Sequence, residues 1–241
     1  MPLHDHFHPP WSVQRPWEGF HSAWATAIAF HLNSGLLPGD YFAMPLLEVG
    51  GRIEVDGGTF QEAEGAGDAS GGEGTAAWAP PRPTLTIPLE AAATDAFEVQ
   101  VLRNLGGPQL RAAIELVSPA NKDRAGSRRV FAAKCAGYLR RRVAVMVIDV
   151  VTARLANLHA ELLRALDRAE ESSWESPSRL YAVSYRGVLE ADPPRLEAWP
   201  EVLAVGSTLP VLPLWLEPDL SVRLPLEESY AVTCGSLRMR G

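Results

Sequence analysis

The chain has 241 residues, of which 46% are hydrophobic and 21% are charged, and its formal net charge is −7. This composition is that of an ordinary globular protein, and the length suffices for one sizeable hydrophobic core. The negative charge disfavours a general binder of nucleic acid or membrane surfaces, because both classes need a basic surface that neutralises phosphates.

Two features of the sequence bear on its compartment. The first twenty residues lack the charged-then-apolar pattern of a secretory leader, and no apolar run approaches the ~18 residues of a membrane span. The two cysteines, Cys135 and Cys234, lie far apart and match no metal-ligand spacing. We therefore expect a protein of the reducing cytoplasm that has neither a disulfide framework nor a membrane partner.

Residues 1–16 are expected to form an extended arm, because Pro9-Pro10 and Pro16 oppose helix formation. Three histidines alternate along this arm, at His4, His6 and His8. In an extended chain they would share one face, and imidazole is a common metal ligand. The arm is thus either a histidine metal site or a segment that docks on the surface of the domain.

A helix and a hairpin are expected next. Aromatic and apolar side chains recur at helical spacing over residues 17–33. Residues 41–60 predict a hairpin whose turn is Gly50-Gly51. Glu54 and Asp56 would project from the same face of its second strand, because they are two positions apart.

A low-complexity segment rich in Gly, Ala, Glu and Pro occupies residues 61–83. Such a segment buries too little surface to offset its ordering entropy, so we expect a flexible insertion within a single domain. Three strands are expected after it, at residues 84–90, 96–103 and 109–117. Glu98 on the second of these strands would approach Glu115 on the third.

The stretch from Gln109 to Val151 predicts a strand, a turn, a helix and a second strand, which together make a βαβ unit. Each apolar strand carries one acid, Glu115 in the first and Asp149 in the second. On the helix expected over residues 124–142, Lys134 falls within the apolar face. A lone buried ammonium is costly, so Lys134 should have an acidic partner, and Glu115 is the candidate. The alternative is a lysine at the edge of the face whose ammonium reaches solvent.

The last third of the chain is expected to add one helix and several strands. Leucines recur at helical spacing over residues 155–170, a pattern typical of core or of a dimer face. Residues 179–189 predict a strand with one buried face. Residues 190–241 are expected to form a C-terminal extension that packs on the core, with a buried strand at 211–216 and a closing segment at 226–237.

Several motifs resemble an uncharacterised bacterial family, domain of unknown function 4058. The central ones are Glu115-Leu116-Val117-Ser118-Pro119-Ala120-Asn121-Lys122, then Lys134, then Val147-Ile148-Asp149. A W..FH pattern at residues 17–21 and an LP…PD tail at residues 209–219 extend the resemblance over most of the chain. The central motifs are also similar to the Uma2-like group of the restriction-endonuclease-like, PD-(D/E)XK superfamily.

The resemblance implies an α/β fold in which residues 1–241 form one domain around an αβββαβ core. It implies that Asp56 is the first aspartate and Glu115 the second acid of a site that binds Mg²⁺ or Mn²⁺, with Glu98 as the alternative acid. Hard divalent cations prefer such oxygen ligands. It further implies that Lys134 positions or activates the attacking water.

The sequence also departs from the superfamily motif. Val55 stands in place of the motif's proline, and Val117 in place of its strand lysine. We therefore expect a degenerate, non-catalytic member that acts as an interaction or assembly module, including self-association. The alternative is a divalent-metal-dependent nuclease or phosphodiesterase that uses Asp56, Glu115 and Lys134. Nucleic acid would then have to meet a local basic patch, at Arg128, Arg129 and Arg140–Arg142.

Overall fold

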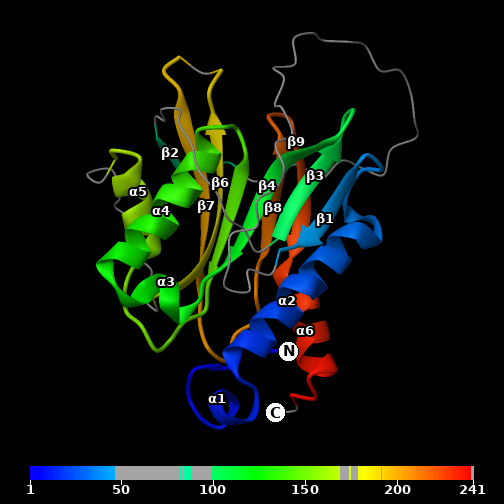
Figure 1. Ribbon diagram of the computed structural model, residues 1–241, viewed down its shortest axis with the longest axis vertical. Helices are drawn as coiled ribbons and strands as arrows, with labels where there is room; N and C mark the ends of the chain where they lie inside the picture. Colours follow the sequence, from blue (N-terminus) through cyan, green and yellow to red (C-terminus); the bar gives the residue numbers. More distant parts are fainter. Residues whose placement is uncertain are drawn as a thin grey trace.

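The computed structural model describes residues 1–46, 82, 84–87, 99–168, 174, 179–190 and 192–239. In these residues the central element is a seven-stranded sheet with the order β1-β3-β4-β5-β6-β7-β2 (Figure 1). Its strands are β1 (Tyr41–Pro45), β2 (Leu85–Ile87), β3 (Val99–Asn104), β4 (Pro108–Leu116), β5 (Ala144–Asp149), β6 (Leu180–Val188) and β7 (Arg195–Leu203). β4 and β5 are parallel, and the other neighbouring pairs are antiparallel. The α/β class predicted from the sequence is confirmed.

The parallel pair is joined by two helices, α3 (Pro119–Asp123) and α4 (Ala125–Leu139). Ser118 begins α3 with a capping box: its side chain accepts from the Asn121 backbone, and the Asn121 side chain accepts from the Ser118 backbone at 2.8 Å. α4 then returns over the sheet to β5. This is the βαβ unit predicted for Gln109–Val151.

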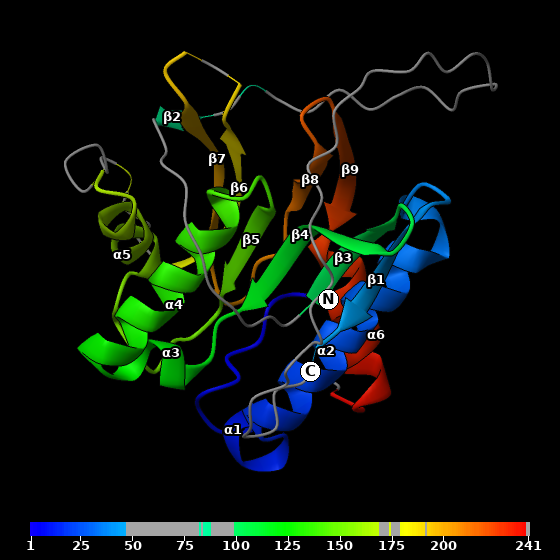
Figure 2. The same ribbon diagram turned by 45° about the horizontal axis from the view of Figure 1, so that its top comes forward.

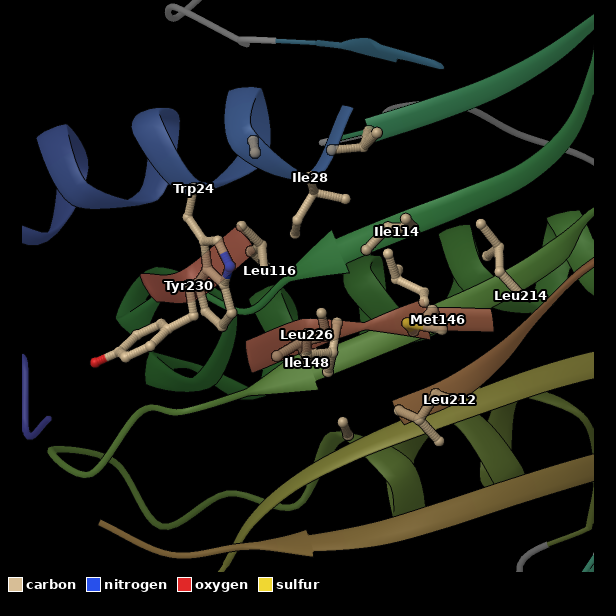
Figure 3. Close-up of a cluster of buried hydrophobic side chains, with 14 of the residues drawn as sticks. Trp24, Ile28, Ile114, Leu116, Met146, Ile148, Leu212, Leu214, Leu226 and Tyr230 are labelled. Carbon is tan, nitrogen blue, oxygen red and sulfur yellow. The ribbon is translucent and has the colours of Figure 1, made fainter. Parts of the chain in front are cut away.

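One face of the sheet is covered by two helices and a two-stranded ribbon (Figure 1, Figure 2). These elements are α2 (Trp17–His31), α6 (Leu226–Ser236), β8 (Val211–Glu217) and β9 (Leu220–Pro225). Figure 3 shows Trp24 of α2 and Tyr230 of α6 meeting above the sheet, whose Ile114 and Met146 point into the same cluster. Successive side chains of β4 and β5 point to opposite faces of the sheet, so their apolar residues contribute alternately to the clusters on the two faces.

The opposite face is covered by α4 and by α5 (Leu158–Ala165). The helix predicted over residues 155–170 is shorter than expected, because Asn157 caps it: the Asn157 side chain accepts from the Ala160 backbone at 3.1 Å. Leu158 and Leu162 of α5 are buried in this second cluster. Of the two interpretations of the leucine pattern, core packing is therefore confirmed.

Strands β6 and β7 differ from what the sequence predicts, and β1 is the first strand of the expected hairpin. β6 is buried on both faces, so the prediction of one buried face was wrong; the cause is that the sheet lies between two layers. β7, at Arg195–Leu203, pairs with β6 inside the main sheet rather than packing on it as part of an extension. β1 pairs with β3, while the second strand of the hairpin expected at 41–60 lies outside the described residues. So does the insertion at 61–83 apart from Arg82.

The N-terminal arm docks on the first face, next to α6. Its Leu3 backbone donates to the Ser207 carbonyl at 2.8 Å, and His6 Nε2 lies 2.9 Å from the Tyr230 hydroxyl. The arm is not extended throughout, because α1 (Trp11–Gln14) makes one helical turn after the two prolines. The docked interpretation of the arm is confirmed.

Candidate functional site

The candidate site begins with an acid of β4 and a lysine of α4. Glu115 projects from β4 toward the α4 layer, and Lys134 Nζ lies 2.7 Å from Glu115 Oε1 and 2.8 Å from Oε2. The carboxylate side chain is 3% exposed and the lysine side chain 16% exposed. The contact predicted from the strand and helix periodicities is confirmed. Burial, and secondarily the Glu115 charge, raise the pKa of the neighbouring Cys135 thiol, so this thiol stays protonated.

A second buried pair, Lys122 and Asp149, was not predicted as a contact. Lys122 Nζ of α3 donates to Asp149 Oδ2 of β5 at 2.8 Å, and both side chains are fully buried. Asp149 Oδ1 accepts from the Val151 backbone at 3.0 Å. Burial raises the pKa of Asp149 to about 6, although Lys122 and the hydrogen bonds act in the opposite direction.

Both acids lie on the same face of the parallel pair. Glu115 pairs in register with Val147, and Asp149 follows two positions later on the same side of β5. α3, which begins with the capping box at Ser118, and α4 lie above this face and supply one lysine each. Two acid–lysine pairs therefore lie under one helical layer.

Aromatic hydroxyls and a histidine continue this polar layer toward α5. His159 Nδ1 lies 2.6 Å from the Tyr185 hydroxyl, and the His159 backbone donates to the Tyr181 hydroxyl at 3.0 Å. Tyr181 in turn pairs with Asp149 in the β5–β6 register. Burial lowers the pKa of His159 to about 4, so its ring is neutral at pH 7. His159 belongs to none of the motifs described above; its signal in the sequence is a histidine within a leucine-spaced helix.

The other acids assigned from the resemblance, Asp56 and Glu98, lie outside the described residues. Across the part of the chain that is described, no group of three or more His, Cys, Asp or Glu side chains is arranged to hold a metal ion. At Glu115 both carboxylate oxygens lie against the Lys134 ammonium and are nearly excluded from water. A Mg²⁺ or Mn²⁺ site needs several converging oxygen ligands, and Asp56 and Glu98, the acids that would join Glu115 there, are not among the described residues.

Two of the three histidines of the arm, His4 and His6, lie together, and His8 lies apart from them. His6 is buried against Tyr230, whereas His8 Nδ1 lies 2.8 Å from the Asp5 carboxylate at the surface. The His4 ring lies against Trp11, and its centre is 6.4 Å from that of His6. The arm therefore brings the His4 and His6 rings into an edge contact beside Tyr230, and its turn after Asp5 places His8 at the surface.

Comparison with protein-family models, with curated proteins and with solved structures found no match to this chain. None of the described helices is long and apolar enough to cross a bilayer.

Proposed function

We propose that this chain is a non-catalytic member of the restriction-endonuclease-like superfamily that works as a binding module. The order of its elements supports the superfamily: α2, β1, β3, β4, α4 and β5 follow one another as helix, three strands, helix and strand, with β2 inserted before β3. The parallel pairing of β4 and β5 across α4 agrees with the same core.

The observation that supports the non-catalytic role is the burial of both acids against lysine ammonium groups. Glu115 and Asp149 each have a lysine ammonium within 2.8 Å, and neither carboxylate side chain is more than 3% exposed. A carboxylate that binds a metal must turn its lone pairs toward the ion, whereas one oxygen of each of these acids, Glu115 Oε2 and Asp149 Oδ2, accepts a hydrogen bond from an ammonium group. Breaking such a buried pair is strongly destabilising, at about 3–5 kcal/mol. The pairs therefore serve the fold first.

The leucines of α5 do not supply the binding surface. Leu158, Leu162 and Leu163 are buried in the chain's own core, so self-association through this face would require the helix to leave the sheet. A homo-oligomer of this chain would therefore have to form through other surfaces.

The second candidate function is a divalent-metal-dependent nuclease or phosphodiesterase. The observation in its favour is that Lys134 touches Glu115 and remains 16% exposed, as expected of a lysine that can reach a substrate. This function also needs an acid from Asp56 or Glu98, both of which lie outside the described residues.

Calorimetric titration of Mg²⁺ and of Mn²⁺ into metal-free protein separates the two functions. The variants are Glu115→Gln and, as a matched control, Glu190→Gln, which removes one charge from a surface acid that is 51% exposed. We expect no saturable binding to any of the three proteins, and a lower melting temperature for Glu115→Gln alone, because it weakens the Lys134 pair.

One-to-one binding that Glu115→Gln abolishes and Glu190→Gln retains would overturn the non-catalytic role. Cleavage of single- or double-stranded DNA by the metal-loaded wild type, lost in Lys134→Met, would then establish the nuclease.

A further inference from the structure

The end of the sheet opposite α3 carries a cleft lined with arginines. It lies where β4 and β5 begin, between the β3–β4 turn, the end of α4 and the β8–β9 turn. Its volume is about 840 Å³, within the range of about 300–1,000 Å³ that is usual for small-molecule sites. The cleft is separate from the Glu115 pair, which lies further along β4 beneath α4.

The lining has an excess of positive charge in a chain whose net charge is −7. Five arginines line it against two glutamates, Glu190 and Glu217, and two further carboxylates, Asp40 and Glu197, pair with Arg103 and Arg186. The arginines come from the β3–β4 hairpin, from the turn after α4 and from β6: Arg103, Arg111, Arg141, Arg142 and Arg186. Five guanidinium groups thus meet four carboxylates, and an anion bound among them would offset the remaining positive charge.

One carboxylate orients two of the arginines. Glu217 Oε1 accepts from Arg103 Nη1 at 3.0 Å and from the Tyr41 hydroxyl at 2.9 Å, and it lies 3.6 Å from Arg111 Nε. Arg111 Nε is shielded from solvent and has no hydrogen-bond partner. Burial, and secondarily Glu217, raise the pKa of Tyr41 to about 12, so Tyr41 stays a donor. Asp40 also accepts from Arg103 Nε at 2.6 Å, so two guanidinium groups meet two carboxylates at this wall, and the donor left without a hydrogen-bond partner is Arg111 Nε.

A third arginine forms a flat wall. The Arg186 guanidinium lies 3.6 Å from the centre of the Trp215 ring, and Glu197 holds its Nε at 2.7 Å. At the mouth, Arg142 pairs with Glu190 at 3.2 Å, and both side chains are largely exposed. Exposed pairs of this kind contribute little, so Arg142 can turn to a bound anion at small cost. Arg141 beside it is exposed and has no ion pair with any residue that the structure describes.

We propose that this cleft binds a phosphate-bearing small molecule up to the size of a nucleoside diphosphate. Guanidinium groups suit phosphate because their planar forks donate two parallel hydrogen bonds to it. Leu105, Leu110 and Val143 supply apolar lining for the body of the ligand. A long nucleic-acid chain fits less well, because it would extend past the cleft onto an acidic protein. The proposal does not depend on whether Glu115 is catalytic.

The test is calorimetric titration of inorganic pyrophosphate, of ADP and of a ten-nucleotide single-stranded DNA into the wild-type chain at two salt concentrations. The cleft variants are Arg141→Gln with Arg142→Gln, and Arg111→Gln. The matched control for the double cleft variant is Arg124→Gln with Arg154→Gln, which also removes two positive charges, from surface arginines whose side chains are 86% and 47% exposed. Circular dichroism and melting temperature verify the fold of each variant.

We expect one-to-one binding of pyrophosphate and ADP. Loss of charge-assisted hydrogen bonds should weaken it about ten-fold or more in each cleft variant, and the control should bind as the wild type does. Absence of saturable binding, or an equal loss in the control, would overturn the proposal. So would binding of the oligonucleotide alone, which would assign the cleft to nucleic acid instead.

Discussion

Replacement of Lys122 by Met should destabilise the fold in a strongly pH-dependent way. Lys122→Met removes the ammonium from Asp149 Oδ2 and leaves a carboxylate that is fully buried, with the Val151 backbone donating only to Oδ1. Loss of one partner of a buried ion pair costs about 3–5 kcal/mol of unfolding free energy, and we expect that loss at pH 8, where Asp149 is ionised in the wild type.

The loss should shrink as the pH falls. Burial already raises the pKa of Asp149 to about 6 with Lys122 present, so the carboxyl of the folded wild type is mostly protonated at pH 5. The pKa of Asp149 is higher in the folded protein than in the unfolded chain. Its contribution to the unfolding free energy is therefore most favourable below about pH 4 and declines as the pH rises through 6. In the variant the folded pKa rises further, and at pH 5 little charge remains to be paired.

Urea unfolding at pH 8 and at pH 5, followed by tryptophan fluorescence, measures both losses. The control is the double variant Lys122→Met with Asp149→Asn, which removes both charges and keeps an oxygen for the Val151 backbone. We expect it to be more stable than the single variant at pH 8. A single-variant loss below about 1 kcal/mol at pH 8, a loss that does not depend on pH, or a double variant as unstable as the single one would refute the reasoning.

Two further predictions concern the two layers. Leu162→Ala in α5 should lower the unfolding free energy by about 2–5 kcal/mol. Leu155→Ala, at a side chain 69% exposed, should change it by less than about 0.5 kcal/mol. Equal losses of the two variants in urea unfolding would contradict the core placement of α5. Burial lowers the pKa of His6 to about 4, so its contribution to stability is complete above its unfolded pKa near 6.5 and is lost as pH falls toward 4. His6→Phe should therefore flatten the dependence of unfolding free energy on pH between 6.5 and 4, and an unchanged slope would show that His6 does not titrate as a buried group.

The contact of Lys134 with Glu115 could be predicted because two periodicities suffice for it. The strand period of two sends Glu115 toward the helix layer, and the helical period sends Lys134 toward the sheet. The contact of Lys122 with Asp149 could not be predicted in this way. α3 has five residues, so its orientation depends on the capping box at Ser118 rather than on a repeating apolar face.

Long-range strand pairing was the other part that the sequence could not supply. β7 was missed because proline is unfavourable inside a sheet, and Pro200 lies within it. β2 pairs with β7 only as far as Ala198. Pro200 therefore lies beyond the stretch of β7 that pairs with β2 in the described residues. Likewise, the pairing of β1 with β3 depends on residues far apart in the chain, which no local pattern specifies.

The docked arm has a consequence for folding during synthesis. The His4 backbone donates to the hydroxyl of Tyr230, 226 positions later, and Phe20 and Trp24 pack on the same ring. A ribosome therefore finishes α2 long before it makes the helix that covers it. Until α6 emerges, the aromatic surface of α2 stays open to other partners, which favours aggregation or capture by chaperones. A nascent chain that stops before Leu226 would keep that surface permanently and should be a good target for protein quality control.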